Sequence, residues 1–239
     1  MNPETLDGDP ARWMCQLLQA GDSFYPTGSY AHSFGLEGLV DLGVVHDTAS
    51  LRGHLHHAVL PALARVELPL AAHAWRALSA TPPAWEVLAG IAELAAALKP
   101  ARELRCASEN IGRQRAELAA NLHRHPLAVE YLARAAANGW MHSAALSAAL
   151  EGRVCAAPLE AVLAGMSYAT LAGQLAAAMK VLRLGQNASQ GLLTEVLGEV
   201  PALVAAARDL PLAEIGWFNP WLDIAAARHE TASARLFIS

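Results

Sequence analysis

The longest run without a charged residue extends from Ala161 to Met179, and it limits what the chain can fold into. The run is about as long as a helix that crosses a bilayer. It is rich in alanine rather than leucine or isoleucine, however, and it also carries the polar side chains of Ser167, Tyr168, Thr170 and Gln174. We therefore expect a core helix of a soluble bundle and no membrane span.

Small residues recur every four positions along this expected helix, at Ala161, Gly165, Ala169, Gly173 and Ala177. Such a row forms a groove that another helix can approach closely. Each glycine inside a helix costs roughly 1 kcal/mol relative to alanine. We therefore expect close packing against a neighbouring helix to compensate for this cost.

The rest of the chain also favours helices. Hydrophobic residues make up 54% of the sequence but aromatic residues only 6%, and no stretch alternates β-branched and polar residues as a half-buried strand does. The clearest amphipathic segment covers residues 101–122, where apolar residues recur at helical spacing. The sequence predicts an all-α fold, a single-domain bundle of about eight to ten helices spanning residues 1–239.

Prolines and caps predict the ends of several helices. Asp47 can cap a helix that begins near Thr48, and Pro61 and Pro69 are expected to kink or break that helix. Gly185 is placed to end the long helix that begins at Pro158. A last helix is expected from Trp221 to Ser233. The N-terminal segment 1–10 and the C-terminal tail 228–239 are expected to be flexible.

The net charge and the sequence motifs limit the classes of function that we expect for this chain. A formal net charge of -5 argues against binding nucleic acid. The three cysteines are far apart and form no paired motif, and the N-terminus does not resemble a signal peptide, so we expect a cytoplasmic protein with free thiols. The sequence has no phosphate-binding loop, GxGxxG, GxSxG or HExxH motif. We expect no catalysis and no cofactor.

Histidines offer the main alternative interpretation. His54, His56 and His57 cluster on one expected helix, and His54 and His57 would share a face. No cysteine or carboxylate lies within a turn to complete a ligand set, so a solvated helix face is the simpler interpretation. The alternative is a metal-binding helical protein, and nickel or zinc binding would distinguish the two.

Two further segments are candidates for contacts with other proteins. Residues 22–37 are dense in glycine, aromatic and hydroxyl side chains, and Pro26 and Gly28 define a specific turn, which is either structural or functional. Residues 222–237 mix charged and apolar residues near the end of the chain. Such a tail either frays or folds onto a partner.

Four blocks of residues stand out along the chain. The first contains Pro26, Gly28, Tyr30, His32, Ser33, Gly35, Leu36 and Glu37; the second Glu103, Arg105, Ala107, Ser108 and Gly112; the third Lys180, Leu184, Gly185, Gln186 and Gln190; and the fourth Asp223, Ile224, Ala225, Arg228, His229, Glu230, Arg235, Leu236 and Phe237. In this order, the four blocks resemble the urease accessory protein family UreF. Two positions depart from the family pattern: Arg183 stands where proline is common, and Ser233 where tyrosine is usual.

This resemblance implies an all-α homodimer that bridges UreD (also called UreH) to the GTPase UreG, so that nickel reaches the urease apoprotein. Lys180 matches a family position linked to the UreG surface, and the fourth block resembles the segment that orders against UreD. The resemblance thus implies a set of partner-binding residues: Pro26, Gly28, Tyr30, His32, Ser33, Gly35, Glu37, Lys180, Gly185, Gln186, Asp223, Arg228, His229, Glu230 and Arg235.

Overall fold

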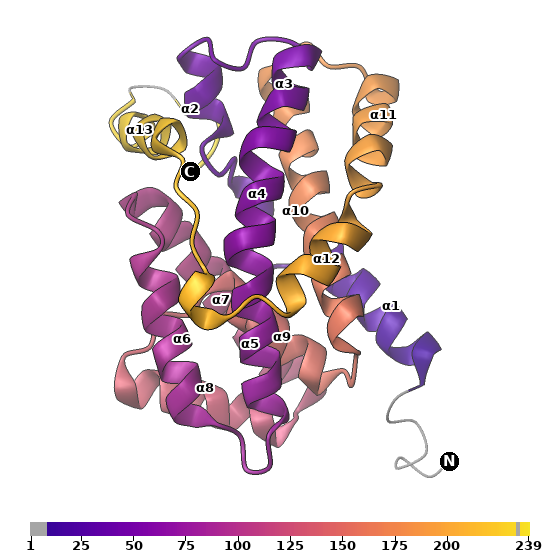
Figure 1. Cartoon of the computed structure of the whole chain (residues 1–239), viewed down its shortest axis with the longest axis vertical. Coiled ribbons are helices and arrows are strands. Elements are labelled where there is room, and N and C mark those ends of the chain that lie inside the picture. Colours follow the sequence, from indigo (N-terminus) through magenta and orange to yellow (C-terminus); the bar gives the residue numbers. More distant parts are fainter. Residues whose placement is uncertain (1–8, 233–234) are drawn as a thin grey trace.

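The computed structural model describes residues 9–232 and 235–239, and over these residues it contains helices and loops but no strand (Figure 1). The prediction of an all-α fold is confirmed. Its last predicted helix reached Ser233, a position outside the described residues. The α-helices are α1 (Pro10–Gly21), α2 (Leu36–Asp41), α3 (Thr48–His54), α4 (Leu60–Ala62), α5 (Leu68–Ser79), α6 (Trp85–Ala97), α7 (Arg102–His123), α8 (Pro126–Asn138), α9 (Ala144–Val154), α10 (Leu159–Val181), α11 (Gln186–Leu197), α12 (Val200–Arg208) and α13 (Pro220–His229).

The helix that begins at Thr48 continues past both prolines, so the predicted break does not occur. α3, α4 and α5 are joined by two π-helical segments, Leu55–Val59 and Leu63–Glu67, into one continuous helix that ends at Ser79. A proline lacks the N–H of a regular helical turn, and here each proline follows a widened turn in which the bonding pattern has already shifted. The predicted cap is confirmed, since the Asp47 carboxylate accepts the Ser50 N–H at 2.7 Å.

The second π segment also binds the connection between α12 and α13, residues 209–219, which crosses this long helix and which we call the strap. The Arg65 carbonyl accepts the Gly216 N–H at 3.0 Å, and the Arg65 guanidinium donates to the Glu214 carbonyl at 3.1 Å. Farther along the helix, the His73 ring bonds the Leu210 carbonyl at 2.8 Å. Figure 1 shows that this strap leads from α12, near the middle of the molecule, to α13, which lies beside α2 at the upper left.

The core forms around α5, which packs against α6, α9, α10 and α12. Its side chains Leu68, Leu70 and Ala71 are fully buried. α7 and α9 pack closely because α7 presents small residues to α9. At Gly112, an added Cβ would lie only 2.2 Å from the His142 carbonyl oxygen. Gly112 belongs to the second sequence block, so helix packing explains why a glycine stands at this position of the block.

α10 is a core helix, packed against α1, α2, α5, α9, α11 and α12. By length and composition alone it could cross a membrane, but buried helices of soluble proteins pass the same test. It ends at Val181, three residues before Leu184, the last residue ahead of the expected stop at Gly185. Gly185 does not end it with a left-handed residue; instead it precedes α11 with φ -74°.

The row of small residues on α10 is only partly covered by this chain. A Cβ added at Gly165 or at Gly173 would meet no other atom within 4 Å, and Gly173 is exposed. Close packing by another helix of the same chain, which we expected along the whole row, is therefore absent at these two described positions. This face of α10 is open.

Candidate partner-binding surface

Two glycines allow α13 to lie directly on α2. Gly35 precedes α2 with φ +87°, and an added Cβ there would lie 2.6 Å from Cδ1 of Leu222. At Gly38, one turn along α2, an added Cβ would lie 2.6 Å from the Ala225 carbonyl oxygen. Side chains at these positions would therefore push α13 away from α2.

Glu37, between these two glycines, is a buried carboxylate that holds the C-terminal tail. It accepts the backbone N–H groups of Leu236 at 2.8 Å and of Phe237 at 3.0 Å, and it contacts Nε2 of His229 at 2.9 Å. Burial opposes ionisation of Glu37, but these two N–H groups and the His229 ring together hold the pKa of Glu37 below its ordinary value. The carboxylate is therefore charged over the neutral range.

His229 connects Glu37 to a second buried carboxylate. Its Nδ1 lies 3.0 Å from Glu103 on α7, while its Nε2 faces Glu37 on α2. Glu103 also accepts a bond from Arg235, through Oε1 at 3.2 Å. We call Glu37, Glu103, His229 and Arg235 the tail network; it joins α2, α7, α13 and the last described residues by charge-assisted hydrogen bonds.

The end of the chain closes against the loop before α2. The Ser239 carbonyl accepts the N–H of Phe34 at 3.1 Å and also that of Ser33, and the Ser239 hydroxyl lies 2.7 Å from Nδ1 of His32. The Gln174 side chain of α10 donates to the Ser33 carbonyl at 3.1 Å. We expected residues 228–239 to be flexible, yet in the structure His229, Phe237 and Ser239 are buried.

Lys180 stands beside the tail at the C-terminal end of α10. Its ammonium lies 3.4 Å from the centre of the Tyr30 ring and 4.9 Å from that of Phe237. Within residues 9–232 and 235–239, Lys180 forms no ion pair. The aromatic rings and the helix terminus stabilise the cation without neutralising it, so its charge is available to a partner.

The structure brings most of the expected partner-binding residues to one end of the molecule. Tyr30, His32, Ser33, Gly35, Glu37, Lys180, His229 and Arg235 all take part in the contacts described above. Around them, Arg228 is exposed, Glu230 bonds Arg102 at 2.7 Å, and burial raises the pKa of Asp223.

Four expected residues lie apart from the tail network. Pro26 and Gly28 face Gln114 on α7, in the earlier part of the loop. Gly185 and Gln186 are exposed at the start of α11. Sequence reasoning also missed members of the site: Glu103, Gln174, Phe237 and Ser239. Glu103 and Phe237 stand in the quoted blocks, but no spacing rule connects them to residues more than a hundred positions away.

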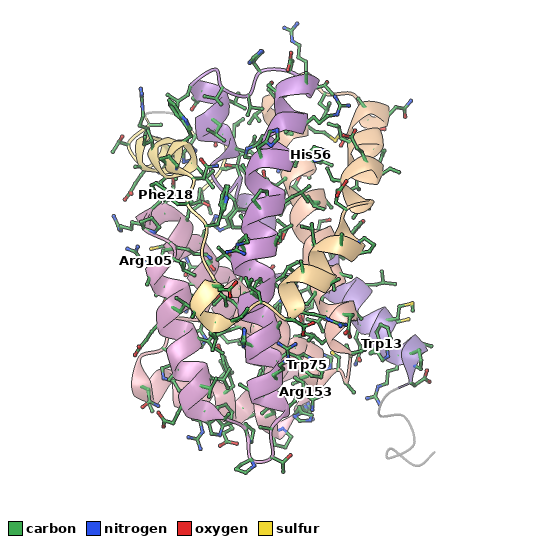
Figure 2. All side chains as sticks on the ribbon, viewed as in Figure 1. Trp13, His56, Trp75, Arg105, Arg153 and Phe218 are labelled. Atoms are coloured by element: carbon green, nitrogen blue, oxygen red, sulfur yellow. The ribbon has the colours of Figure 1, made fainter. Side chains whose placement is uncertain are left out.

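Exposed apolar side chains lie on or next to α13 and on the tail, the two segments that carry His229 and Arg235. Trp221 and Ile224 of α13 are 63% and 49% exposed, and Leu236 and Ile238 of the tail are 72% and 62% exposed. Phe218, just before α13, is exposed at the outer side of the molecule (Figure 2). We call these five residues the α13 patch. Neighbouring exposed apolar side chains of this kind are typical of protein interaction sites.

The three clustered histidines have different surroundings. His54 is buried, and burial lowers the pKa of its ring. His56 bonds Glu195 of α11 at 3.2 Å and is labelled in Figure 2, while His57 is exposed. The described residues contain no group of three or more histidine, cysteine or acidic side chains placed to hold a metal ion. No observation therefore favours the metal-binding alternative.

Comparison with known proteins decides the family. The model of the UreF family matches residues 45–197. The chain is 35% identical to the urease accessory protein UreF of Azoarcus sp. (strain BH72), over 95% of both chains. This chain belongs to the UreF family. It is also 34% identical to UreF of Bordetella parapertussis, over 90% of this chain and 96% of that one.

One relative is a longer, bifunctional protein. The bifunctional urease accessory protein UreEF of Bordetella bronchiseptica is 34% identical over 95% of this chain, which covers 52% of that longer protein. Its name joins two accessory activities in one polypeptide. Membership of the UreF family therefore places this chain among urease accessory proteins, which act in the maturation of another enzyme.

The tail network predicts that Glu37→Gln is strongly destabilising. The substitution removes one of the two carboxylate partners of His229 and the charged acceptor of the Leu236 and Phe237 amides in a buried site. We expect a loss of about 3 kcal/mol in the free energy of unfolding, measured by urea denaturation. Glu195→Gln is the matched control, because Glu195 also bonds a histidine and an arginine but lies at the surface. Equal effects of the two substitutions would contradict the importance of the buried network.

Proposed function

We propose that this chain is a cytoplasmic, non-catalytic adaptor that bridges UreD (UreH) and the GTPase UreG during nickel insertion into the urease apoprotein. The observation that carries the proposal is the gathering of residues from all four sequence blocks at one end of the fold. There the residues of the α13 patch are exposed, and the Lys180 cation contacts Phe237, which lies between the patch residues Leu236 and Ile238 in the chain. A binding protein needs such a prearranged surface, whereas an enzyme needs activated groups in a cleft.

Co-expression with the two proposed partners tests the adaptor function. We expect tagged UreD to retain this chain, and UreG to be retained only when this chain is present. A strain that lacks the gene and still produces fully nickel-loaded urease would contradict the proposal.

The α13 patch is the proposed site for UreD. Exposed apolar side chains near the centre of an interface contribute most of its binding energy, so we expect Ile224→Asp to weaken UreD binding at least about tenfold without changing the melting temperature. Val87→Asp is the matched control, since Val87 is 46% exposed on α6, outside the patch. Binding should be measured by titration calorimetry, and equal losses for both variants would rule out a specific role of the patch.

Lys180 is the proposed contact for UreG. We expect Lys180→Ala to lower urease activation severalfold while costing less than about 1 kcal/mol of stability, because an exposed cation–π contact contributes little to folding. Arg183→Ala removes the same charge three residues farther along and should leave activation unchanged. If Lys180→Ala instead unfolds the protein, its role is structural.

The open face of α10 is the proposed surface for a second copy of the chain. Tyr168 on α10 is exposed there, and Met14 and Leu18 are exposed on α1, which packs on the same helix. A Cβ at Gly173 meets no other atom within 4 Å, so Gly173→Leu adds a bulky side chain to this face, and we expect it to shift the protein from dimer to monomer in sedimentation velocity. Gly191→Leu on α11 is the control, and a monomeric unsubstituted protein would contradict the proposal.

A further inference from the structure

Pro69 removes one hydrogen bond from the continuous helix formed by α3, α4 and α5. In an α-helix each N–H donates to the carbonyl four residues before it, and proline has no N–H. The carbonyl that position 69 would bond belongs to Arg65. The helix continues past this missing bond because the preceding turn is widened, with the Leu68 N–H donating to the Leu63 carbonyl. A carbonyl without its helical donor remains an acceptor for another part of the chain.

The strap supplies the missing donor. The Gly216 N–H donates to the Arg65 carbonyl at 3.0 Å, and the Arg65 guanidinium donates to the Glu214 carbonyl at 3.1 Å. One residue of the helix therefore binds the strap through both its backbone and its side chain. Between these two contacts, the Ile215 side chain is buried in the core.

The other proline of the same helix shows that a free carbonyl alone does not explain this contact. The two turns share the pattern Leu-x-x-x-x-Leu-Pro, and each contains a π-helical segment. The bond missing at Pro61 would go to the His57 carbonyl. Within residues 9–232 and 235–239, no donor from outside the helix bonds the His57 carbonyl. The strap docks only at the turn that ends in Pro69.

The two halves of the strap are held separately. Near α12, the His73 ring bonds the Leu210 carbonyl at 2.8 Å, and Arg76 pairs with Asp209 at 3.0 Å. These contacts on α5 do not involve the Arg65 carbonyl. It is therefore the half next to α13 that depends on Arg65.

The docked strap determines where α13 begins. Phe218 of the α13 patch follows Gly216 by two residues, so their Cα atoms lie at most about 7 Å apart. Asn219 comes next and caps α13, because its Oδ1 accepts the Leu222 N–H at 3.3 Å. The bond to Arg65 therefore holds the start of α13, while α2 holds the rest of that helix.

We propose that Pro69 is a positioning residue for the α13 patch. By leaving the Arg65 carbonyl without its helical donor, it docks the strap and thereby holds Phe218 and the first turn of α13 in place. A substitution that restores a regular helix at position 69 therefore disturbs a surface on another part of the molecule. The docking is a property of the chain alone, whereas its consequence for UreD binding rests on the proposed function.

Amide hydrogen exchange in the full chain tests the docking. Pro69→Ala returns an N–H that competes with Gly216 for the Arg65 carbonyl, so we expect the Gly216 amide to exchange about fivefold faster, as for one hydrogen bond of ordinary net strength. Pro61→Ala is the matched control and should leave this rate unchanged. The amide of Leu150, buried on α9, separates local opening from a general loss of stability. An unchanged Gly216 rate in Pro69→Ala, or equal acceleration by Pro61→Ala, refutes the proposal.

A pair of variants in the strap tests the same contact without changing the helix, and it decides the matter if Pro69→Ala loosens the whole fold. Gly216→Pro removes the N–H that bonds Arg65, and Ile215 already has the extended backbone, with ψ 120°, that a following proline requires. Gly216→Ala is the control, because its Cβ meets only Leu98, at 3.9 Å.

The Leu222 amide reports the first turn of α13 in both strap variants. We expect it to exchange about fivefold faster in Gly216→Pro, because the strap no longer holds this turn, and at an unchanged rate in Gly216→Ala. If the Leu222 amide stays equally protected in Gly216→Pro, the strap does not position α13 and the proposal is refuted.

Binding of UreD separates this proposal from the proposed function. Pro69→Ala and Gly216→Pro should weaken UreD binding at least about threefold, because the patch is less well preorganised, whereas Pro61→Ala and Gly216→Ala should not. If the amides respond as expected but the unsubstituted chain does not bind UreD, the docking stands and the proposed partner is wrong. If UreD binds the unsubstituted chain and Gly216→Pro equally well, the positioning role is wrong and the partner stands.

Discussion

The buried contact between Glu37 and His229 holds together the end of the molecule that carries its candidate function. Taking a carboxylate and an imidazole ring out of water is costly unless every donor and acceptor is paired. Here both ring nitrogens and both oxygens of Glu37 have partners, including two tail amides. Because these partners come from α2, α7, α13 and the tail, the network requires all four to be in place at once, and that requirement fixes the α13 patch in space.

The same network explains why this surface suits docking. Its charged groups face inward and satisfy one another, whereas Trp221, Ile224, Leu236 and Ile238 remain outside with no cover in the described chain. A preformed apolar surface loses little conformational freedom on binding, and this raises affinity. Lys180 adds a cation at the edge of the patch, so one end of the molecule offers both an apolar contact and a charge with no ion-pair partner among the described residues.

Local patterns predicted the helices well, because periodicity and caps act within a few residues: the Asp47 cap and the amphipathic α7 are examples. The break expected at the prolines of the long helix does not occur, because a π-helical segment precedes each proline. No sequence rule predicts such segments. The site was predictable only through the resemblance to a family. Glu37 and Glu103 each lie more than a hundred residues before His229 in the sequence. Only in the structure does the packing of α13 on Gly35 and Gly38 show that Glu37 and His229 come together.

Cys155 and His123 lie together as a catalytic pair would, but their surroundings do not favour a reactive thiol. Sγ of Cys155 lies 3.7 Å from Nε2 of His123, as a nucleophile lies beside its base. Burial and the nearby Glu151 carboxylate raise the pKa of Cys155 to about 12, so the thiol keeps its proton instead of becoming a reactive thiolate. Glu151 is itself bound by Tyr25 and Arg115, which fasten the loop after α1 to α7 and α9. These buried polar groups therefore hold helices in place.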